Sequence, residues 1–241
     1  MKFDVRKATK ETMGQYLELL TPNVNTESEV LYWCDLAKQY QLRTQLANFM
    51  WIPLLVDYHK DTGIKVGGGV TFPNGAEHPE TKAKAVEQLL KAGVNTIDFS
   101  MNFRALLAKR DDIVREELRL YAGLAKGHAE TKVIIEAPML ETDDNIRKAC
   151  DMVVDQGFDW VKTATGVLEK PLSLEHVATV LNALRGTGTR CKVSGVKFPR
   201  AQNAYVYLMA GAELIGTKSI VEVVDGLDKL RNLGVLPAYE G

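Results

Sequence analysis

The sequence contains few of the residues that build disulfide frameworks or metal centres. Its three cysteines, Cys34, Cys150 and Cys191, are far apart, odd in number and in no CxxC spacing. We therefore expect three reduced thiols in a protein core and no disulfide framework. The four histidines are scattered over segments expected to be loops or helices, so no metal site is predicted. The expected chemistry uses neither a metal nor another cofactor.

Neither sign of charge dominates the chain. It has 30 Lys and Arg against 31 Asp and Glu, a formal net charge of −1. This balance argues against nucleic acid or an anionic membrane as the main partner. No apolar run is long enough to cross a bilayer, and the segment MKFDVRKATKETMGQY at the start lacks the apolar core of a signal peptide. The sequence predicts a soluble, cytoplasmic protein whose partners are small molecules.

What the chain does contain is a regular series of short runs rich in β-branched and apolar residues. Eight such runs are typical of strands. They are YLELL (16–20), LANFMW (46–51), KVGGGVTF (65–72), TIDFSMN (96–102), KVIIEAP (132–138), WVKTATG (160–166), CKVSGV (191–196) and ELIGT (213–217).

Segments with helical periodicity separate these runs. The helix expected after Thr26 opens with a capping box, Thr26-Glu27-Ser28-Glu29. Three more are expected around 78–92, 142–156 and 173–185, each with a glycine at or near its end, the usual helix stop. Strands that alternate with helices predict a parallel sheet with right-handed crossovers. Eight units predict a (β/α)8 TIM barrel that forms a single domain over residues 1–241, with an open doubly wound sheet as the structural alternative.

A weak internal repeat gives the barrel an orientation. The segments AGVNTID from Ala92, QGFDWVK from Gln156 and AGAELIG from Ala210 read alike. Their last residues are Asp98, Lys162 and Gly216. If the glycines are equivalent helix stops, these three residues lie at the same level in their strands, towards the carboxyl ends where barrel active sites form.

Lys162 is the most informative residue. Alternation places it on the face opposite Val161, and a lysine inside a barrel is costly unless it is paired or functional. Lys192 lies on the next expected strand, and a second ammonium group nearby lowers the pKa of an amine nucleophile. Asp98 could pair with the surplus charge and relay protons. Two lysines and one aspartate inside a barrel mouth are suited to Schiff-base chemistry. The alternative interpretation of these three residues is a buried structural ion pair.

Other residues could bind a phosphate group. Phosphate sites in barrels form where the last loops meet helix N-termini. The candidates there are Gly195 with Val196, and the run Gly216-Thr217-Lys218-Ser219, with Thr165 and Gly166 as a third edge. We expect Thr165, Gly166, Gly195, Gly216, Lys218 and Ser219 to form the site.

The sequence also predicts the environment of two charged residues and of one glycine triplet. Glu136, at a strand end, is expected to orient a lysine or support the site, whereas Lys132, at the start of the same run, is expected to be solvated. The triplet Gly67-Gly68-Gly69 indicates close backbone approach in a strand rather than a hinge or a dinucleotide site.

The sequence from about Thr26 to Val224 resembles the deoxyribose-phosphate aldolases. The likeness is densest in FPNG (72–75), the IDFSMN run with Ala105-Leu106 after it, KVIIE (132–136), VKTATG (161–166), KVSG (192–195) and IGTKS (215–219). The resemblance implies a TIM barrel in which Lys162 forms the Schiff base. It also implies that Asp98 and Lys192 relay protons and tune the nucleophile. Thr165, Gly166, Gly195, Gly216 and Ser219 fall on its phosphate-contacting segments.

The sequence also departs from that family's pattern. The family usually has an Asp-His-Thr motif on its first strand, and YLELLTP contains no clear equivalent. Leu46 stands where the family usually has an active-site cysteine. In the phosphate loop, Val196 stands where the family usually has a second glycine, and Lys197-Phe198-Pro199 replaces the Ile-Arg-Thr that usually follows. In the last phosphate turn, Lys218 replaces a small residue.

We therefore expect a metal-independent class I aldolase that reversibly cleaves 2-deoxy-D-ribose 5-phosphate to acetaldehyde and D-glyceraldehyde 3-phosphate. One alternative is a Schiff-base lyase or transaldolase acting on another sugar phosphate or hydroxy-ketone. Another is a barrel that binds sugar phosphates without turnover. A metal-dependent aldolase is disfavoured. A homodimer is the candidate assembly, since barrels of this kind often form one.

Overall fold

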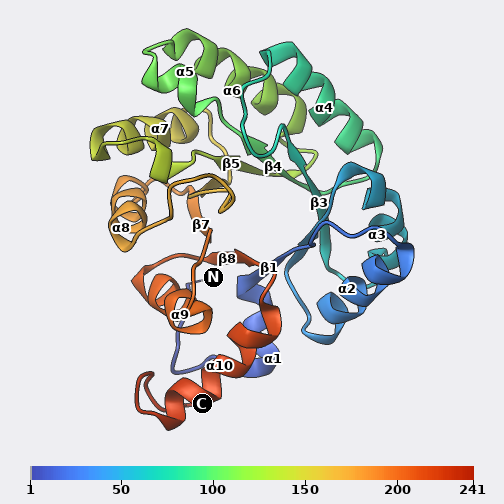
Figure 1. Cartoon of the computed structure of the whole chain (residues 1–241), viewed down its shortest axis with the longest axis vertical. Helices are drawn as coiled ribbons and strands as arrows, with labels where there is room; N and C mark the ends of the chain where they lie inside the picture. Colours follow the sequence, from blue (N-terminus) through green and yellow to red (C-terminus); the bar gives the residue numbers. More distant parts are fainter. Residues whose placement is uncertain (1) are drawn as a thin grey trace.

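The computed structural model describes residues 2–241 and contains a closed barrel of parallel strands encircled by helices (Figure 1). The strands follow one another around the barrel in sequence order, and β1 pairs with β8 to close it. The expected (β/α)8 TIM barrel is confirmed. The strands are β1 (Leu17–Leu20), β2 (Thr44–Leu46), β3 (Lys65–Val70), β4 (Thr96–Ser100), β5 (Glu130–Ile134), β6 (Trp160–Lys162), β7 (Arg190–Ser194) and β8 (Leu214–Thr217).

Helices begin and end largely where their sequence signals predict. The capping box at Thr26 is present, because its hydroxyl accepts from the Glu29 amide and the Glu29 side chain returns to the Thr26 amide. Gly93, Gly157 and Gly186 have positive φ angles after three of the helices. The helices are α1 (Lys10–Met13), α2 (Glu27–Gln39), α3 (Ile52–His59), α4 (Pro79–Lys91), α5 (Phe103–Leu107), α6 (Asp111–Ala125), α7 (Asp143–Asp155), α8 (Leu174–Ala183), α9 (Arg200–Ala210) and α10 (Ile220–Asn232).

The strand expected over 46–51 is only partly correct. The strand β2 ends at Leu46, and Phe49–Trp51 forms a 3₁₀ turn that leads into α3. Pro53 lies in the first turn of α3, where its missing N–H is tolerated, so the helix begins directly after this turn. The apolar side chains of Phe49 and Met50 are consequently exposed near the carboxyl ends of the strands rather than buried in a sheet.

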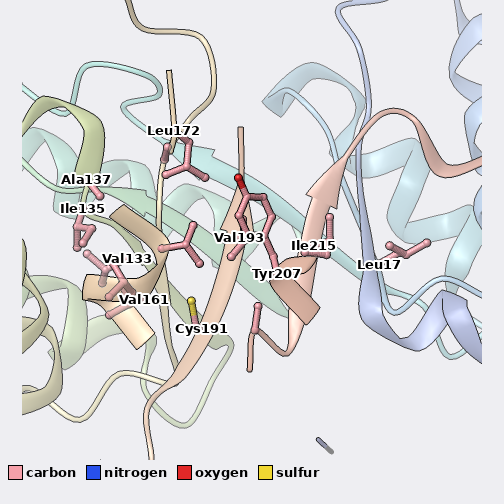
Figure 2. Close-up of a cluster of buried hydrophobic side chains, with 14 of the residues drawn as sticks. Leu17, Val133, Ile135, Ala137, Val161, Leu172, Cys191, Val193, Tyr207 and Ile215 are labelled. Atoms are coloured by element: carbon pink, nitrogen blue, oxygen red, sulfur yellow. The ribbon is translucent and has the colours of Figure 1, made fainter. Parts of the chain in front are cut away.

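The main hydrophobic core lies between the barrel and its helices. Leu17, Val133, Val161, Val193 and Ile215 alternate with inward-facing residues and are fully buried. Figure 2 shows these side chains gathered beside their strands. Each contributes roughly 1.5–3 kcal/mol by burial. The outward face therefore stabilises the fold, and the inward face is left for polar groups.

The glycine triplet in β3 allows the close approach that its sequence predicts. A Cβ on Gly67 would lie 2.7 Å from the Thr96 carbonyl oxygen, and one on Gly68 would lie 2.7 Å from Leu89 Cδ2. A side chain at either position would collide with the next strand or with the helix layer.

A cluster of charged side chains closes the amino-terminal mouth of the barrel. The Glu130 carboxylate lies 2.7 Å from Arg43, 3.2 Å from Lys65 and 3.1 Å from Arg190. Burial alone would raise the pKa of Glu130, but Lys132, Arg43 and Lys65 outweigh it and lower that pKa to about 2. The Arg190 guanidinium lies 4.0 Å from the centre of the Trp160 ring. These charged and aromatic side chains therefore gather at the amino-terminal end of the barrel.

No helix of residues 2–241 is long and apolar enough to cross a membrane.

Candidate active site

Lys162 is the last residue of β6, and its side chain lies inside the barrel. Only 1% of the residue is exposed. Its Nζ donates to Asp98 Oδ2 at 2.7 Å and lies 5.7 Å from the centre of the Phe72 ring. The contact brings together two residues chosen from the sequence, although the strand register aligns Lys162 with Ile134 and Ser100 rather than with Asp98. A single carboxylate oxygen and an aromatic face thus hold the amine at the carboxyl end of the barrel.

The same carboxylate oxygen holds a second lysine. Lys192, in the middle of β7, donates from Nζ to Asp98 Oδ2 at 2.7 Å. Burial lowers the pKa of Lys192 well below its ordinary value. Because both amines meet at one oxygen, a proton can pass between Lys162 and Lys192 through Asp98. The three residues chosen from the sequence therefore form one contiguous group.

The expectation that Lys132 is solvated was wrong. Lys132 is fully buried and points into the barrel beneath Asp98, with its Nζ 3.8 Å from Asp98 Oδ1 and in contact with the Thr96 hydroxyl. Burial, opposed by the carboxylates of Asp98 and Glu130, lowers the pKa of Lys132. Register explains the position, because Lys132 pairs directly with Asp98 across β4 and β5 and faces the same side of the sheet.

Sequence reasoning also missed Glu18. This residue of β1 is fully buried, and its carboxylate contacts Lys192 Nζ through one oxygen and lies 3.1 Å from Lys132 Nζ through the other. The first strand therefore does supply an acidic group, although it lacks the Asp-His-Thr motif. The available signal was alternation, because Leu17 and Leu19 pack outward and leave Glu18 facing the interior.

Together these five residues form a buried charge cluster: Glu18, Asp98, Lys132, Lys162 and Lys192. Within the cluster three lysines share two carboxylates, and the next carboxylate, Glu130, lies 3.9 Å from Lys132 and is already paired with other cations. Full ionisation would therefore leave excess positive charge in a low-dielectric interior. Burial lowers the pKa values of Lys132 and Lys192, which favours the neutral form of each amine. An interior that keeps an amine unprotonated can support nucleophilic attack on a carbonyl carbon.

Two of the expected phosphate-binding turns lie against each other above this cluster. Gly166, after β6, and Gly195, after β7, have φ angles of 79° and 87°. A Cβ on Gly166 would lie 2.7 Å from Gly195 Cα. Thr165 precedes this contact and is buried. The backbone of both turns can therefore approach a ligand closely.

The remaining predicted phosphate residues are placed differently from one another. Gly216 lies within β8 and faces the interior, where a Cβ would lie 3.0 Å from Lys192 Cε. Ser219 immediately precedes α10, and its amide donates to the Thr217 hydroxyl at 3.0 Å. Lys218 is exposed. Gly216 thus makes room for Lys192, whereas Lys218 and Ser219 remain near the start of a helix.

Glu136 supports the turn after β6. It has left-handed backbone angles, φ 53° and ψ 54°, and its buried carboxylate accepts from the Thr165 amide at 2.8 Å. Burial raises the pKa of Glu136, and the bond from Thr165 opposes that rise. Glu136 therefore fixes the turn that carries Thr165 and Gly166, and it is not bonded to a lysine of the cluster. Among residues 2–241 no group of three or more His, Cys, Asp or Glu side chains is placed to hold a metal ion.

The contact between the two turns gives a first prediction. We expect Gly166→Ala to lower the free energy of unfolding by roughly 2–3 kcal/mol, because a positive φ angle costs about 1–2 kcal/mol and the methyl group would also displace Gly195. Gly186→Ala is the matched control, since Gly186 has a φ angle of 81° but nothing within 4 Å of its Cβ position. Guanidinium unfolding would measure both. Equal losses in the two variants would show that the turns do not rely on close contact.

Comparison with known proteins places the chain in a family. It matches no family model. It is 35% identical over 201 residues to a deoxyribose-phosphate aldolase of Geobacillus sp. (strain WCH70), which covers 83% of this chain and 89% of that protein. The chain belongs to the deoxyribose-phosphate aldolase family. A deoxyribose-phosphate aldolase of Clostridium novyi is 31% identical over 224 residues, 92% of this chain and 99% of its own length.

Solved structures agree with the family at the level of the fold. The deoxyribose phosphate aldolase of Aeropyrum pernix, described as tetrameric, superposes with a TM-score of 0.82 at 28% identity over 93% of this chain and 94% of that chain. Orotidine 5′-phosphate decarboxylase of Pyrococcus horikoshii, with a TM-score of 0.62 at 14% identity, shares only the barrel. The alignment with the Aeropyrum pernix structure thus covers nearly the whole chain.

Proposed function

We propose that this member of the deoxyribose-phosphate aldolase family is a class I aldolase that reversibly cleaves 2-deoxy-D-ribose 5-phosphate into acetaldehyde and D-glyceraldehyde 3-phosphate. The observation that carries the proposal is the shared carboxylate: Lys162 Nζ and Lys192 Nζ both lie 2.7 Å from Asp98 Oδ2 inside the barrel. This arrangement gives an amine nucleophile, a neighbouring proton carrier and a base in one buried group.

Cleavage begins at Lys162. Its unprotonated amine attacks the aldehyde carbon of the open-chain sugar to give a carbinolamine, and loss of water gives an iminium ion. The hydroxyl on the third carbon then gives up its proton to the Asp98 carboxylate, directly or through water. The electron pair of the bond between the second and third carbons moves into the iminium group and forms an enamine. The third carbon leaves as the aldehyde of glyceraldehyde 3-phosphate.

The cycle closes by proton return. The enamine takes up a proton at its second carbon, and water then hydrolyses the imine to release acetaldehyde and free Lys162. Asp98 can exchange the proton with Lys192, which burial keeps weakly basic. Glu18 contacts Lys192 from the other side and holds its side chain in place. The cluster thus supplies each proton transfer without a metal.

The phosphate group is proposed to bind beside the paired turns. The backbones of Gly166 and Gly195 lie against each other just after the carboxyl ends of β6 and β7. Ser219 is the N-cap of α10, which follows the neighbouring strand β8. Helix N-termini and glycine turns favour anions. Lys218 is exposed nearby in the sequence and can add a positive charge, while Thr165 is held in place by Glu136.

Borohydride reduction in the presence of acetaldehyde tests the proposed function. We expect the reduced imine, an N-ethyl group, on the peptide that contains Lys162. Peptides with the equally buried Lys82, Lys132 and Lys192 serve as internal controls and should stay unmodified. Failure to label Lys162 in folded protein would contradict the Schiff-base mechanism. Thermal stabilisation by the sugar phosphate in that case would favour a binding protein without turnover.

A further inference from the structure

The barrel holds a buried hydroxyl group that the proposed mechanism does not use. Ser194 is the last residue of β7 and has no exposed surface. Its backbone groups already have partners. Ser194 N donates to Thr163 Oγ1 at 3.2 Å, and Ser194 O accepts from the same hydroxyl at 3.2 Å. Its own Oγ has no hydrogen-bond partner among residues 2–241.

The position of this hydroxyl is set by its neighbours in the barrel. Ser194 lies two residues beyond Lys192 on the same strand, so alternation directs both side chains inward. Gly216 is its partner across β8, and a Cβ at Gly216 would overlap Ser194 Oγ and lie 3.0 Å from Lys192 Cε. The absence of a side chain at Gly216 therefore leaves space for the hydroxyl beside Lys192, one layer nearer the carboxyl end.

A buried hydroxyl without a partner is costly. Most buried polar side-chain atoms form at least one hydrogen bond, and an unsatisfied one retains the free-energy penalty of losing water. The backbone bonds to Thr163 would remain with alanine at this position, so the hydroxyl is not needed to hold the strand. The unmet hydrogen bond points to a ligand that enters the barrel.

We infer that Ser194 Oγ binds the hydroxyl of the acceptor aldehyde on the carbon next to its carbonyl group. This inference rests on the proposed function and names the feature of the substrate that the site selects, an α-hydroxy aldehyde that carries a phosphate. Ser194 is a specificity residue in this role, since the bond-making atoms belong to Lys162 and the acceptor carbonyl.

The path of the substrate supports this assignment. The imine carbon is attached to Lys162 on β6, and the proposed phosphate site begins at Gly195, directly after Ser194 on β7. In glyceraldehyde 3-phosphate the carbon that bears the free hydroxyl lies between the reacting carbonyl and the phosphate ester. A substrate bound at both ends therefore carries that hydroxyl past the end of β7, where Ser194 lies.

Two acceptors that differ in one oxygen test the inference. Addition of acetaldehyde to glyceraldehyde 3-phosphate is compared with addition to 3-phosphooxypropanal, which keeps the phosphate and lacks the hydroxyl. We expect Ser194→Ala to lower kcat/KM for the hydroxylated acceptor about 10-fold and to leave kcat/KM for the other acceptor unchanged. Because the hydroxyl is unpaired in the free protein, the thermal midpoint of the variant should not fall.

Ser100→Ala is the matched control. Ser100 is the last residue of β4, is 2% exposed, and its Oγ likewise has no partner in the described chain. β4 is separated from β7 by β5 and β6 and carries no proposed phosphate segment. We expect this variant to keep the acceptor preference of the unaltered protein.

The outcomes separate the inference from the proposed function. Equal losses with both acceptors, or an unchanged ratio in Ser194→Ala, would overturn the role of Ser194 if acetaldehyde is still trapped on Lys162. A lower thermal midpoint with an unchanged ratio would assign Ser194 to the fold. If the unaltered protein shows no trapping on Lys162, the proposed function fails instead.

Discussion

Replacing Lys162 by alanine is expected to lower kcat/KM for cleavage of 2-deoxy-D-ribose 5-phosphate by roughly 10⁴-fold or more. The substitution removes the only proposed nucleophile, and the loss of such a group cannot be offset by the rest of the site. Asp98 keeps its bond to Lys192 in this variant, so no carboxylate is left buried without a cation. The circular dichroism spectrum and the thermal midpoint should therefore stay close to those of the unaltered protein.

A second substitution distinguishes a nucleophile from a structural charge. Lys162→Arg keeps a cation beside Asp98, but a guanidinium group stays protonated and does not attack a carbonyl. We expect it to be as inactive as Lys162→Ala and to show no labelling with acetaldehyde and borohydride. If the arginine variant retained more than about a tenth of the activity, Lys162 would act through its charge and the Schiff-base mechanism would be wrong.

The grouping of Asp98 with Lys162 could be predicted from the sequence because local signals converge on these two residues. Helix stops at Gly93 and Gly157 fix where the following strands begin, and equal spacing from them leads to Asp98 and Lys162. Alternation with outward apolar residues then decides the face, as Val161 does for Lys162. These signals are short-range, so they survive without knowledge of how the barrel closes.

The other half of the charge cluster depends on closure and was not predicted. Glu18 contacts Lys192, 174 residues away in the chain, because β1 pairs with β8 and β8 with β7. Nothing local to YLELL indicates that its acid meets those lysines. The prediction for Lys132 was wrong for a related reason, because a lysine at the start of a strand is ordinarily solvated. In the folded barrel two buried carboxylates, those of Glu18 and Asp98, stabilise the buried Lys132 side chain.

The phosphate segments show a mixed result for the same physical reason. The glycine turns at Gly166 and Gly195 follow from local backbone needs, and the structure places them in contact. Gly216 instead makes space for Lys192 and Ser194, a packing role that only the neighbouring strand reveals. The chemical type of a turn can thus be predicted from sequence, whereas the atom that occupies the space above a glycine cannot.

Glu18→Gln is expected to lower the free energy of unfolding by about 3 kcal/mol near neutral pH. The substitution keeps the side-chain volume but leaves the buried Lys132, Lys162 and Lys192 with Asp98 as the carboxylate they share, and with Glu130 at 3.9 Å from Lys132. Urea unfolding with a common m-value would measure the loss. Glu116→Gln is the control, because Glu116 pairs with Arg119 on an exposed helix surface and its loss should change stability by less than about 0.5 kcal/mol.

The pH dependence of that loss follows from the buried lysines. Burial holds the pKa of Lys192 and of Lys132 in the folded protein below the value of about 10.4 in the unfolded chain. The unfolded chain therefore binds more protons between the two values, and stability rises with pH across that interval. Without Glu18 the folded pKa values fall further, so the interval extends to lower pH.

The destabilisation of Glu18→Gln relative to the unaltered protein should thus be largest near about pH 6 and smaller near about pH 9, where the lysines lose their protons more readily. An ordinary surface ion pair behaves differently, because its small contribution to stability changes little over this range. A loss of equal size at both pH values would mean that Glu18 stabilises the barrel by packing or by a neutral hydrogen bond. Its carboxylate would then have no part in holding the protons of Lys132 and Lys192.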